Sequence, residues 1–316
     1  MDAASASPAV RTDGLTKHYG QVRALEALSL EVSRGEVFGF LGPNGAGKST
    51  TIRILLGFLH PSAGSASVLG LDAVAESVQI RRHIGYLPGG IAMYDSLSGN
   101  DALDYLADLQ GQPPVRREEL CERLSMPASV RRRRIRDYSR GMRQKMGIIQ
   151  ALQHDPELAI LDEPTEGLDP LMQQAFYSIL EDLRAAGRTV FMSSHILSEV
   201  ERVCDRVAII RTGRLMALHS VDELLARRKR HVQLRWRGSV PDLSGVPGLA
   251  DVVIEGDRMT GTLQGDVAPF VRTVASPSLV DLIIEPARLE EAFLEYYAED
   301  LEGDVPPDRP GKEARA

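Results

Sequence analysis

The sequence is poor in cysteine and has no long apolar run. Only two of its 316 residues are cysteines, Cys121 and Cys204. Two cysteines make neither a disulfide framework nor a zinc site, and they suit a reducing cytosol. No stretch approaches the roughly 18 uncharged apolar residues that a membrane span requires. Any membrane role must therefore come through a partner chain.

The sequence also lacks an excess of positive charge. Its formal net charge is −7, so no overall positive field recruits nucleic acid, and we expect no nucleic-acid partner. The basic run at 131–134 is better explained as a solvated helix face or loop than as a phosphate contact. Residues 1–9 have neither the basic nor the apolar region of a signal peptide. We expect disordered tails at 1–9 and at 303–316.

What the sequence does contain is a phosphate-binding loop. The pattern G-x-x-x-x-G-K-[ST] is matched by Gly42-Pro43-Asn44-Gly45-Ala46-Gly47-Lys48-Ser49, followed by Thr50. Its glycines permit backbone conformations and close approaches that a Cβ would block, and the N–H groups then converge on an anion. Lys48 supplies charge for the β- and γ-phosphates, and the Ser49 hydroxyl can bind Mg²⁺. The loop follows an apolar strand at 36–41 and precedes a helix at 51–56, so we expect all nine residues to bind a nucleotide.

Further polar residues stand at the ends of apolar segments. Asp162 and Glu163 follow the strand at 158–161, and His195 follows the strand at 189–194. Two carboxylates at the carboxyl end of a buried parallel strand are costly unless a cation or a water network uses them. Ser139 is a candidate N-cap of a helix that reaches residue 152. Tyr19 could stack on a base, although its own surroundings favour a half-buried strand tyrosine.

Strands that alternate with helices, with polar chemistry at their carboxyl ends, predict an α/β fold with a parallel sheet. We expect an ATPase domain at 10–217 that begins with antiparallel strands and has a helical subdomain at about 90–155. A small α+β accessory domain is expected at 218–302. Its predicted strands are 231–237, 252–255, 260–264 and 279–285, and its predicted helices lie near 267–274 and 288–298.

Together, five separated motifs resemble those of the ATP-binding-cassette (ABC) ATPase family over about residues 10–217. In order along the chain they are the phosphate loop, Tyr138-Ser139-Arg140-Gly141-Met142, Asp162-Glu163, Gly167-Leu168-Asp169 and His195. The second motif resembles the family's signature, with the serine and second glycine kept and other positions changed. The resemblance implies a P-loop NTPase fold, ATP and Mg²⁺ as cofactors, and a head-to-tail dimer with two ATP sites.

The resemblance also implies roles for individual residues. Asp162 resembles the aspartate that holds Mg²⁺ through water, and Glu163 the general base that polarises the attacking water. His195 resembles the histidine that senses the γ-phosphate. Ser139 and Gly141 would bind the ATP held by the opposite subunit, and Asp169 would signal across the dimer. Tyr19 falls at the family's adenine-stacking position, which reverses the interpretation from its surroundings alone.

One family feature is missing. The family normally places a glutamine after the strand that ends at Leu87, where it reaches the Mg²⁺ and the water and usually contacts the transport subunit. Gly89 occupies that position here, and residues 84–94 contain no Gln, Asn, Glu, Asp or His. This departure predicts unusual Mg²⁺ coordination and coupling.

Two classes of ABC protein compete. One is the energy-supplying subunit of a transporter, and the other is a soluble ATPase that acts on ribosomes or DNA. The chain has a single cassette, and only about ninety residues separate Lys48 from Ser139, too few for the long coiled coil of the DNA-repair type. The stretches 138–145 and 289–294 resemble drug-resistance-type bacterial exporters. That resemblance implies a separate integral-membrane permease, a homodimeric cassette, a drug or antibiotic as a possible substrate, and a place at the cytoplasmic face of the membrane.

Overall fold

The computed structural model describes residues 7–226, 230–238, 243, 245–276 and 278–285. The chain divides into two compact units, Met1–Val221 and Asp222–Ala316. The tail expected at 303–316 and the helix expected at 288–298 lie outside the described residues. Within the stretch expected as the first tail, Ala9 is fully buried, and its backbone hydrogen-bonds Val32 and Leu69.

The first unit contains a six-stranded sheet whose strand order is β10-β9-β3-β8-β7-β6. The five strands β6, β7, β8, β3 and β9 run parallel to one another. The edge strand β10 is antiparallel to β9. Every residue of β3, β7 and β8 is buried, because both faces of a parallel sheet are covered. The strands are β3 (Val37–Leu41), β6 (Ile84–Leu87), β7 (Leu158–Asp162), β8 (Thr189–Ser194), β9 (Arg206–Arg211) and β10 (Arg214–Ser220).

A second sheet is antiparallel, and its strands come partly before and partly after the phosphate loop in the sequence. Its order is β2-β1-β4-β5, with β1 (Val10–Tyr19), β2 (Val22–Val32), β4 (Ala63–Val68) and β5 (Leu71–Asp72). One hydrophobic core joins the two sheets and the first helix, and it includes Leu28, Phe38, Ile52 and Phe191. The phosphate loop is therefore anchored on both sides by packed apolar side chains.

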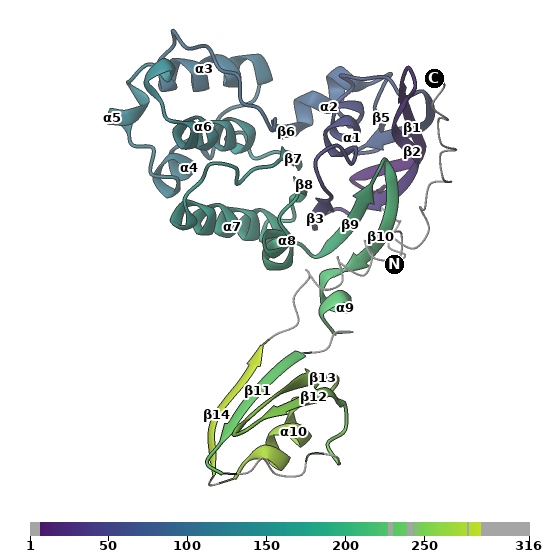
Figure 1. The fold of residues 1–316 in the computed structure, drawn as a ribbon. Coiled ribbons are helices and arrows are strands. Elements are labelled where there is room, and N and C mark those ends of the chain that lie inside the picture. Colours follow the sequence, from purple (N-terminus) through teal and green to yellow (C-terminus); the bar gives the residue numbers. More distant parts are fainter. Residues whose placement is uncertain (1–6, 227–229, 239–242, 244, 277, 286–316) are drawn as a thin grey trace, which may run out of the picture. The chain divides into compact units, whose positions relative to one another are not determined.

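Helices cover the six-stranded sheet and form a separate lobe between β6 and β7 in the sequence (Figure 1). That lobe contains α3 (Gly99–Gln110), α4 (Arg117–Arg123), α5 (Ala128–Arg131), the 3₁₀ helix η1 (Ile135–Asp137) and α6 (Arg140–Leu152). The remaining helices of the unit are α1 (Lys48–Leu55), α2 (Ser77–His83), α7 (Pro170–Ala185) and α8 (Leu197–Val203).

Local sequence signals explain where these helices begin and end. Ser98 forms a capping box with Asp101 at the start of α3, and the Pro113-Pro114 pair separates α3 from α4. The Ser139 hydroxyl accepts a hydrogen bond from Met142 N at the start of α6, as expected for an N-cap. The interpretation of 131–134 as solvated is wrong for Arg131. This side chain is buried and forms two hydrogen bonds to Glu118, at 2.7 and 2.8 Å.

The second unit has a four-stranded antiparallel sheet in the order β12-β13-β11-β14. Its elements are β11 (Arg230–Trp236), β12 (Leu249–Glu255), β13 (Arg258–Leu263), α10 (Val267–Val274) and β14 (Leu279–Glu285), close to the predicted positions. Phe270 and Val274 of α10 share a core with Val232 and Trp236 of β11. A short helix, α9 (Val221–Ala226), spans the division between the units. In the described part of the chain, no helix is both long enough and apolar enough to cross a bilayer.

Candidate functional site

The phosphate loop is a tight turn between β3 and α1. At two of its positions only a glycine fits. Gly47 has φ +110°, and a Cβ there would lie 2.7 Å from the Ala24 carbonyl oxygen. At Gly42 a Cβ would lie 2.3 Å from the Ile210 carbonyl oxygen. Backbone atoms cannot yield at such distances, so any larger residue would reshape the loop. The glycines of the motif therefore serve close packing as well as phosphate approach.

Lys48 is held at the centre of this loop. Its side chain is only 6% exposed, and its Nζ donates to the carbonyl oxygens of Gly42, at 2.6 Å, and Pro43, at 3.3 Å. The same Nζ lies 3.2 Å from Glu163 Oε1. A charge held by loop carbonyls is oriented before a phosphate arrives, which lowers the reorganisation required for binding.

The Asp162 carboxylate lies at the carboxyl end of β7, facing the loop. It is 6% exposed. Its Oδ2 accepts a hydrogen bond of 2.9 Å from Ser49 Oγ, and its Oδ1 accepts one from Ser193 Oγ. A hydroxyl and a carboxylate side by side are the oxygen ligands that Mg²⁺ prefers. Among the described residues, no group of three or more His, Cys, Asp or Glu could enclose a metal ion. This donor set fits Mg²⁺ that takes its other ligands from phosphate and water.

Glu163 and His195 meet at the ends of β7 and β8. His195 Nδ1 lies 2.8 Å from Glu163 Oε2. Glu163 has φ +51°, an uncommon conformation for a residue with a side chain, and its N–H donates to Ser193 O and Ser193 Oγ. Its buried Oε1 has no hydrogen-bond partner, although Lys48 is within ion-pair distance. A carboxylate oxygen without a hydrogen-bond donor, such as Glu163 Oε1, can accept a hydrogen bond from a water molecule.

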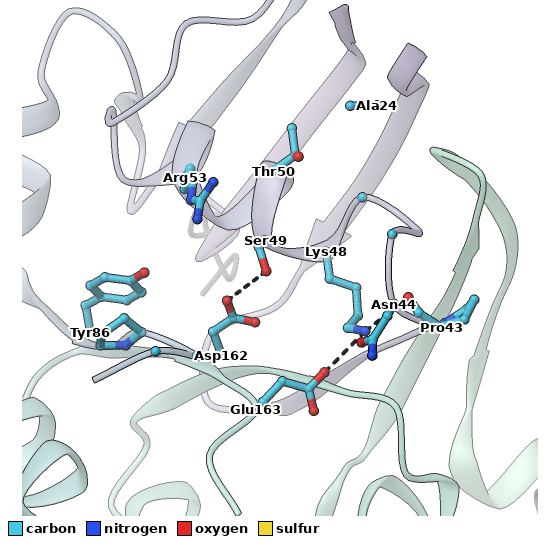
Figure 2. Close-up of a pocket in the computed structure, with 15 residues that line it drawn as sticks. Ala24, Pro43, Asn44, Lys48, Ser49, Thr50, Arg53, Tyr86, Asp162 and Glu163 are labelled. Carbon is cyan, nitrogen blue, oxygen red and sulfur yellow. Dashed lines mark hydrogen bonds and ion pairs between the residues drawn. The ribbon is translucent and has the colours of Figure 1, made fainter. Parts of the chain in front are cut away.

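Lys48, Ser49, Asp162 and Glu163 border one cavity of about 450 Å³ (Figure 2), whereas His195 does not line it and reaches it only through its contact with Glu163. The sequence reasoning missed four residues with side chains that line it, Ala24, Arg53, Tyr86 and Pro88. Arg53 could have been found, since it stands one helical turn after Ser49 on α1. Tyr86 gave no signal, because its position depends on the packing of β6 beside β7. Burial, and secondarily the charge of Asp162, raise the pKa of Tyr86.

Gly89 also lines the cavity and lies directly against Asp162. A Cβ at Gly89 would stand 3.2 Å from Asp162 Oδ2, whereas a Cβ at Gly90 would meet nothing within 4 Å. At the position where the family resemblance leads us to expect a glutamine, the backbone therefore approaches the carboxylate expected to serve Mg²⁺. No side chain extends into the cavity from residues 89 and 90.

The structure does not bring every predicted site residue to this cavity. Tyr19 lies 46% exposed at the end of β1, with Lys17 Nζ 5.4 Å from its ring centroid. Ser139 and Gly141 do not line the cavity. A Cβ at Gly141 would lie 2.8 Å from Gly167 O, so the signature segment packs on the segment that precedes Asp169. Asp169 caps α7 through a 3.0 Å bond from Met172 N.

Known proteins show the same combination of sequence and fold. A family profile described as "ABC transporter" matches residues 25–166. An uncharacterised ABC transporter ATP-binding protein of Nostoc is 39% identical, over 87% of this chain and 83% of its own. The "Daunorubicin resistance ATP-binding protein DrrA3" of Streptomyces coeruleorubidus is 33% identical, over 93% of this chain and 98% of its own. A solved "ATP binding subunit of ABC transporter" has a TM-score of 0.64 and 31% identity, over 68% of this chain and 91% of that one.

Proposed function

This chain belongs to the ATP-binding subunits of ABC transporters, and from this premise we propose how it hydrolyses ATP and what it powers. The predicted fold and family are confirmed, and so is the resemblance to drug-resistance-type exporters. Binding and hydrolysis of ATP to power export are the activities of this family. The proposal concerns the residue roles, the use of Mg²⁺, the dimer and the partner.

The proposed roles of the residues rest on the arrangement of side chains around Glu163. Its carboxylate lies between Lys48 and His195, at the edge of the cavity formed by the phosphate loop. ATP binding would draw Lys48 toward the β- and γ-phosphates and leave Glu163 free to orient a water. In this proposal His195, at hydrogen-bond distance from the same carboxylate, holds Glu163 and contacts the γ-phosphate. Glu163 is then the general base.

Ser49 and Asp162 are the groups that would hold Mg²⁺. Bound there, the ion would neutralise charge on the phosphate oxygens. The two hydrogen bonds received by Asp162 fix both of its oxygens, so the carboxylate is oriented without an ion. Ser193, which donates one of those bonds, also accepts from the Glu163 N–H through its hydroxyl. One serine therefore ties the metal-binding carboxylate to the base.

The dimer is proposed because the signature lies away from the chain's own cavity. Ser139 caps α6 by accepting a hydrogen bond from Met142 N, and Gly141 permits a close backbone approach. Such an N-terminus suits a phosphate supplied from outside the chain. A head-to-tail dimer, with two identical chains as the simplest case, would complete each cavity with the partner's signature.

The proposed export partner is a separate integral-membrane permease, which would hold this chain at the cytoplasmic face of the membrane. The relatives are named as ATP-binding proteins of ABC transporters, and the proposal assigns the spanning pathway to another chain. The name of DrrA3 refers to daunorubicin resistance, and we extend the class, a drug or antibiotic, to this chain. No observation favours the alternative, an ATPase acting on ribosomes or DNA.

Affinity purification of the tagged full-length chain from membranes of its own host tests this function. We expect an integral-membrane protein to co-purify and to raise the rate of Mg²⁺-dependent phosphate release from ATP. Ribosomes or DNA retained through a high-salt wash, with no stimulation by any membrane protein, would overturn the transporter assignment. Such a result would leave the ATPase assignment intact.

A further inference from the structure

Close to the strand ends that carry Glu163 and His195 lies a buried carboxylate with no assigned role. Glu199, in the middle of α8, is only 4% exposed. In the described part of the chain it forms no ion pair, and its hydrogen-bond partners are two hydroxyl groups. Thr165 Oγ1 donates to its Oε1, and Ser194 Oγ donates to its Oε2 at 2.8 Å. A buried charge is costly, and one met only by hydroxyls calls for an explanation beyond ion pairing.

The two hydroxyls belong to the segments that carry Glu163 and His195. Thr165 stands two residues after Glu163, and Ser194 is the residue before His195. Glu199 therefore joins the end of β7 to the end of β8 on the interior side. On the cavity side the same two strand ends are joined by the 2.8 Å contact between Glu163 and His195.

The hydrogen bonds around Ser194 have one consistent direction. Its Oγ accepts the Ile196 N–H at 2.9 Å, and of its two acceptors Glu199 Oε2, at 2.8 Å, is closer than Ile196 O, at 3.3 Å. An ionised carboxylate can only accept, so both hydroxyl protons must point toward Glu199. Such charge-assisted bonds are stronger than neutral ones and restrict the rotation of both hydroxyls. The backbone on either side of His195 is thereby fixed.

We propose that Glu199 is a positioning residue for ATP hydrolysis, which locks the segment after Glu163 to the segment before His195. This inference rests on the proposed function, in which these two side chains place the attacking water. A base must be within hydrogen-bond reach of its proton, and misplacement by about 1 Å can cost roughly 10²-fold in rate. Glu199 itself does not touch the nucleotide, because the cavity is lined by other residues.

The test compares variants of the full-length chain, with ATP as the probe. Glu199→Ala removes both acceptors, and kcat should fall about 10- to 100-fold, while the dissociation constant for ATP stays within about twofold. Binding should persist because the hydrogen-bond partners of Glu199, Thr165 and Ser194, lie outside the phosphate loop. Glu199→Gln keeps one carbonyl acceptor and should restore part of kcat. Thr165→Val breaks a single bond and serves if Glu199→Ala does not fold.

Glu36→Gln is the matched control for burial of a carboxylate. Glu36 is also buried, and it pairs with Arg206 at the opposite end of β3 from the phosphate loop. This control should lower the unfolding temperature and leave kcat unchanged below it. If Glu199→Ala lowers only the unfolding temperature, as Glu36→Gln does, then the role of Glu199 is structural and the proposal fails.

A double-mutant cycle with His195→Ala gives the deciding measurement. If Glu199 acts by placing His195 against Glu163, then removal of His195 should cost much less kcat in the Glu199→Ala background than in the unchanged chain. Fully additive losses would overturn the proposal. The single variants Glu163→Gln and His195→Ala test the proposed function separately. If both retained full turnover, the residue roles would fail whatever Glu199 does.

Discussion

Glu163 and His195 lie 2.8 Å apart, carboxylate oxygen to imidazole nitrogen, at the carboxyl ends of two adjacent parallel strands. They are 32 residues apart in the sequence. Their contact depends on the register of β7 and β8, in which Asp162 pairs with Ser193. Glu163 directly follows β7 and His195 directly follows β8, so the aligned strand ends bring the two side chains together, with Glu163 lining the cavity. The pairing of β7 with β8 therefore brings Glu163 and His195 into contact. The first prediction concerns Glu163.

Glu163→Gln should bind ATP and hydrolyse it poorly. An amide cannot take a proton from water, and loss of a general base typically costs about 10²–10⁴-fold in rate. The variant should also accumulate an ATP-bound dimer, because closure no longer ends in hydrolysis. Phosphate release and size-exclusion chromatography with ATP measure the two effects. Turnover at the wild-type rate would show that Glu163 is not the base.

Lys48→Ala should weaken nucleotide binding by the isolated chain. It removes a buried cation aimed at the phosphates, and it also leaves the Gly42 and Pro43 carbonyl oxygens without that donor. Nucleotide titration followed by calorimetry measures the loss. The paired variant Ser139→Ala should bind ATP as a monomer like the wild type, yet should fail to form the ATP-dependent dimer. Equal loss of monomer binding in both would contradict the shared site.

The pH dependence of stability should include a contribution from His154. Burial lowers its pKa below the ordinary value near 6.5, and the Ile84 carbonyl, 3.2 Å from Nε2, opposes this only in part. The unfolded chain therefore binds the proton more readily. This contribution to stability is complete above the unfolded pKa and is lost as the pH falls through 6.5 toward the folded pKa.

Replacement of His154 tests that contribution. Between pH 7.5 and 5.5, the free energy of unfolding of wild type should fall with a slope steeper than that of His154→Gln, by at most about 1.4 kcal/mol per pH unit. Urea unfolding at several pH values gives both slopes. Identical slopes would mean that His154 titrates alike in both states.

The sequence predicted those parts of the site that are local. The phosphate loop, from Gly42 to Ser49, is a contiguous motif whose strand and helix neighbours have their own apolar patterns. Asp162 and Glu163 could be found because charged residues directly after a buried strand are costly without a use. Each of these signals spans only a few residues, so no knowledge of tertiary packing was needed.

The parts that sequence could not predict depend on contacts between distant segments. Tyr86 reaches the cavity only because β6 pairs with β7, and Glu199 acquires its partners only when α8 packs behind two strand ends. The burial of Arg131 likewise depends on Glu118, thirteen residues away on another helix. The roles of Tyr19, Ser139 and Gly141 stay predictions, because adenine and the partner chain would be needed to observe them.

The last prediction concerns Gly89, where the family's glutamine is missing. Its φ is not among the left-handed values of the chain, so alanine can adopt its backbone conformation. The added Cβ would nevertheless stand 3.2 Å from Asp162 Oδ2 and 3.3 Å from Cγ. Asp162 cannot yield easily, since Ser49 and Ser193 hold its two oxygens.

Gly89→Ala should therefore weaken the binding of Mg²⁺ more than it slows the hydrolysis of ATP. Overpacking costs about 1–3 kcal/mol, and we expect the lower value of this range because Gly89 lies beside an open cavity. The Mg²⁺ concentration for half-maximal ATPase activity should then rise about five- to tenfold. At saturating Mg²⁺ the rate should approach that of wild type. Gly90→Ala is the matched control and should change neither value, because a Cβ there meets nothing within 4 Å. ATPase rates across a Mg²⁺ titration distinguish the outcomes. If Gly89→Ala were as inactive as Glu163→Gln at every Mg²⁺ concentration, Gly89 would serve the attacking water or the permease rather than the carboxylate beside it.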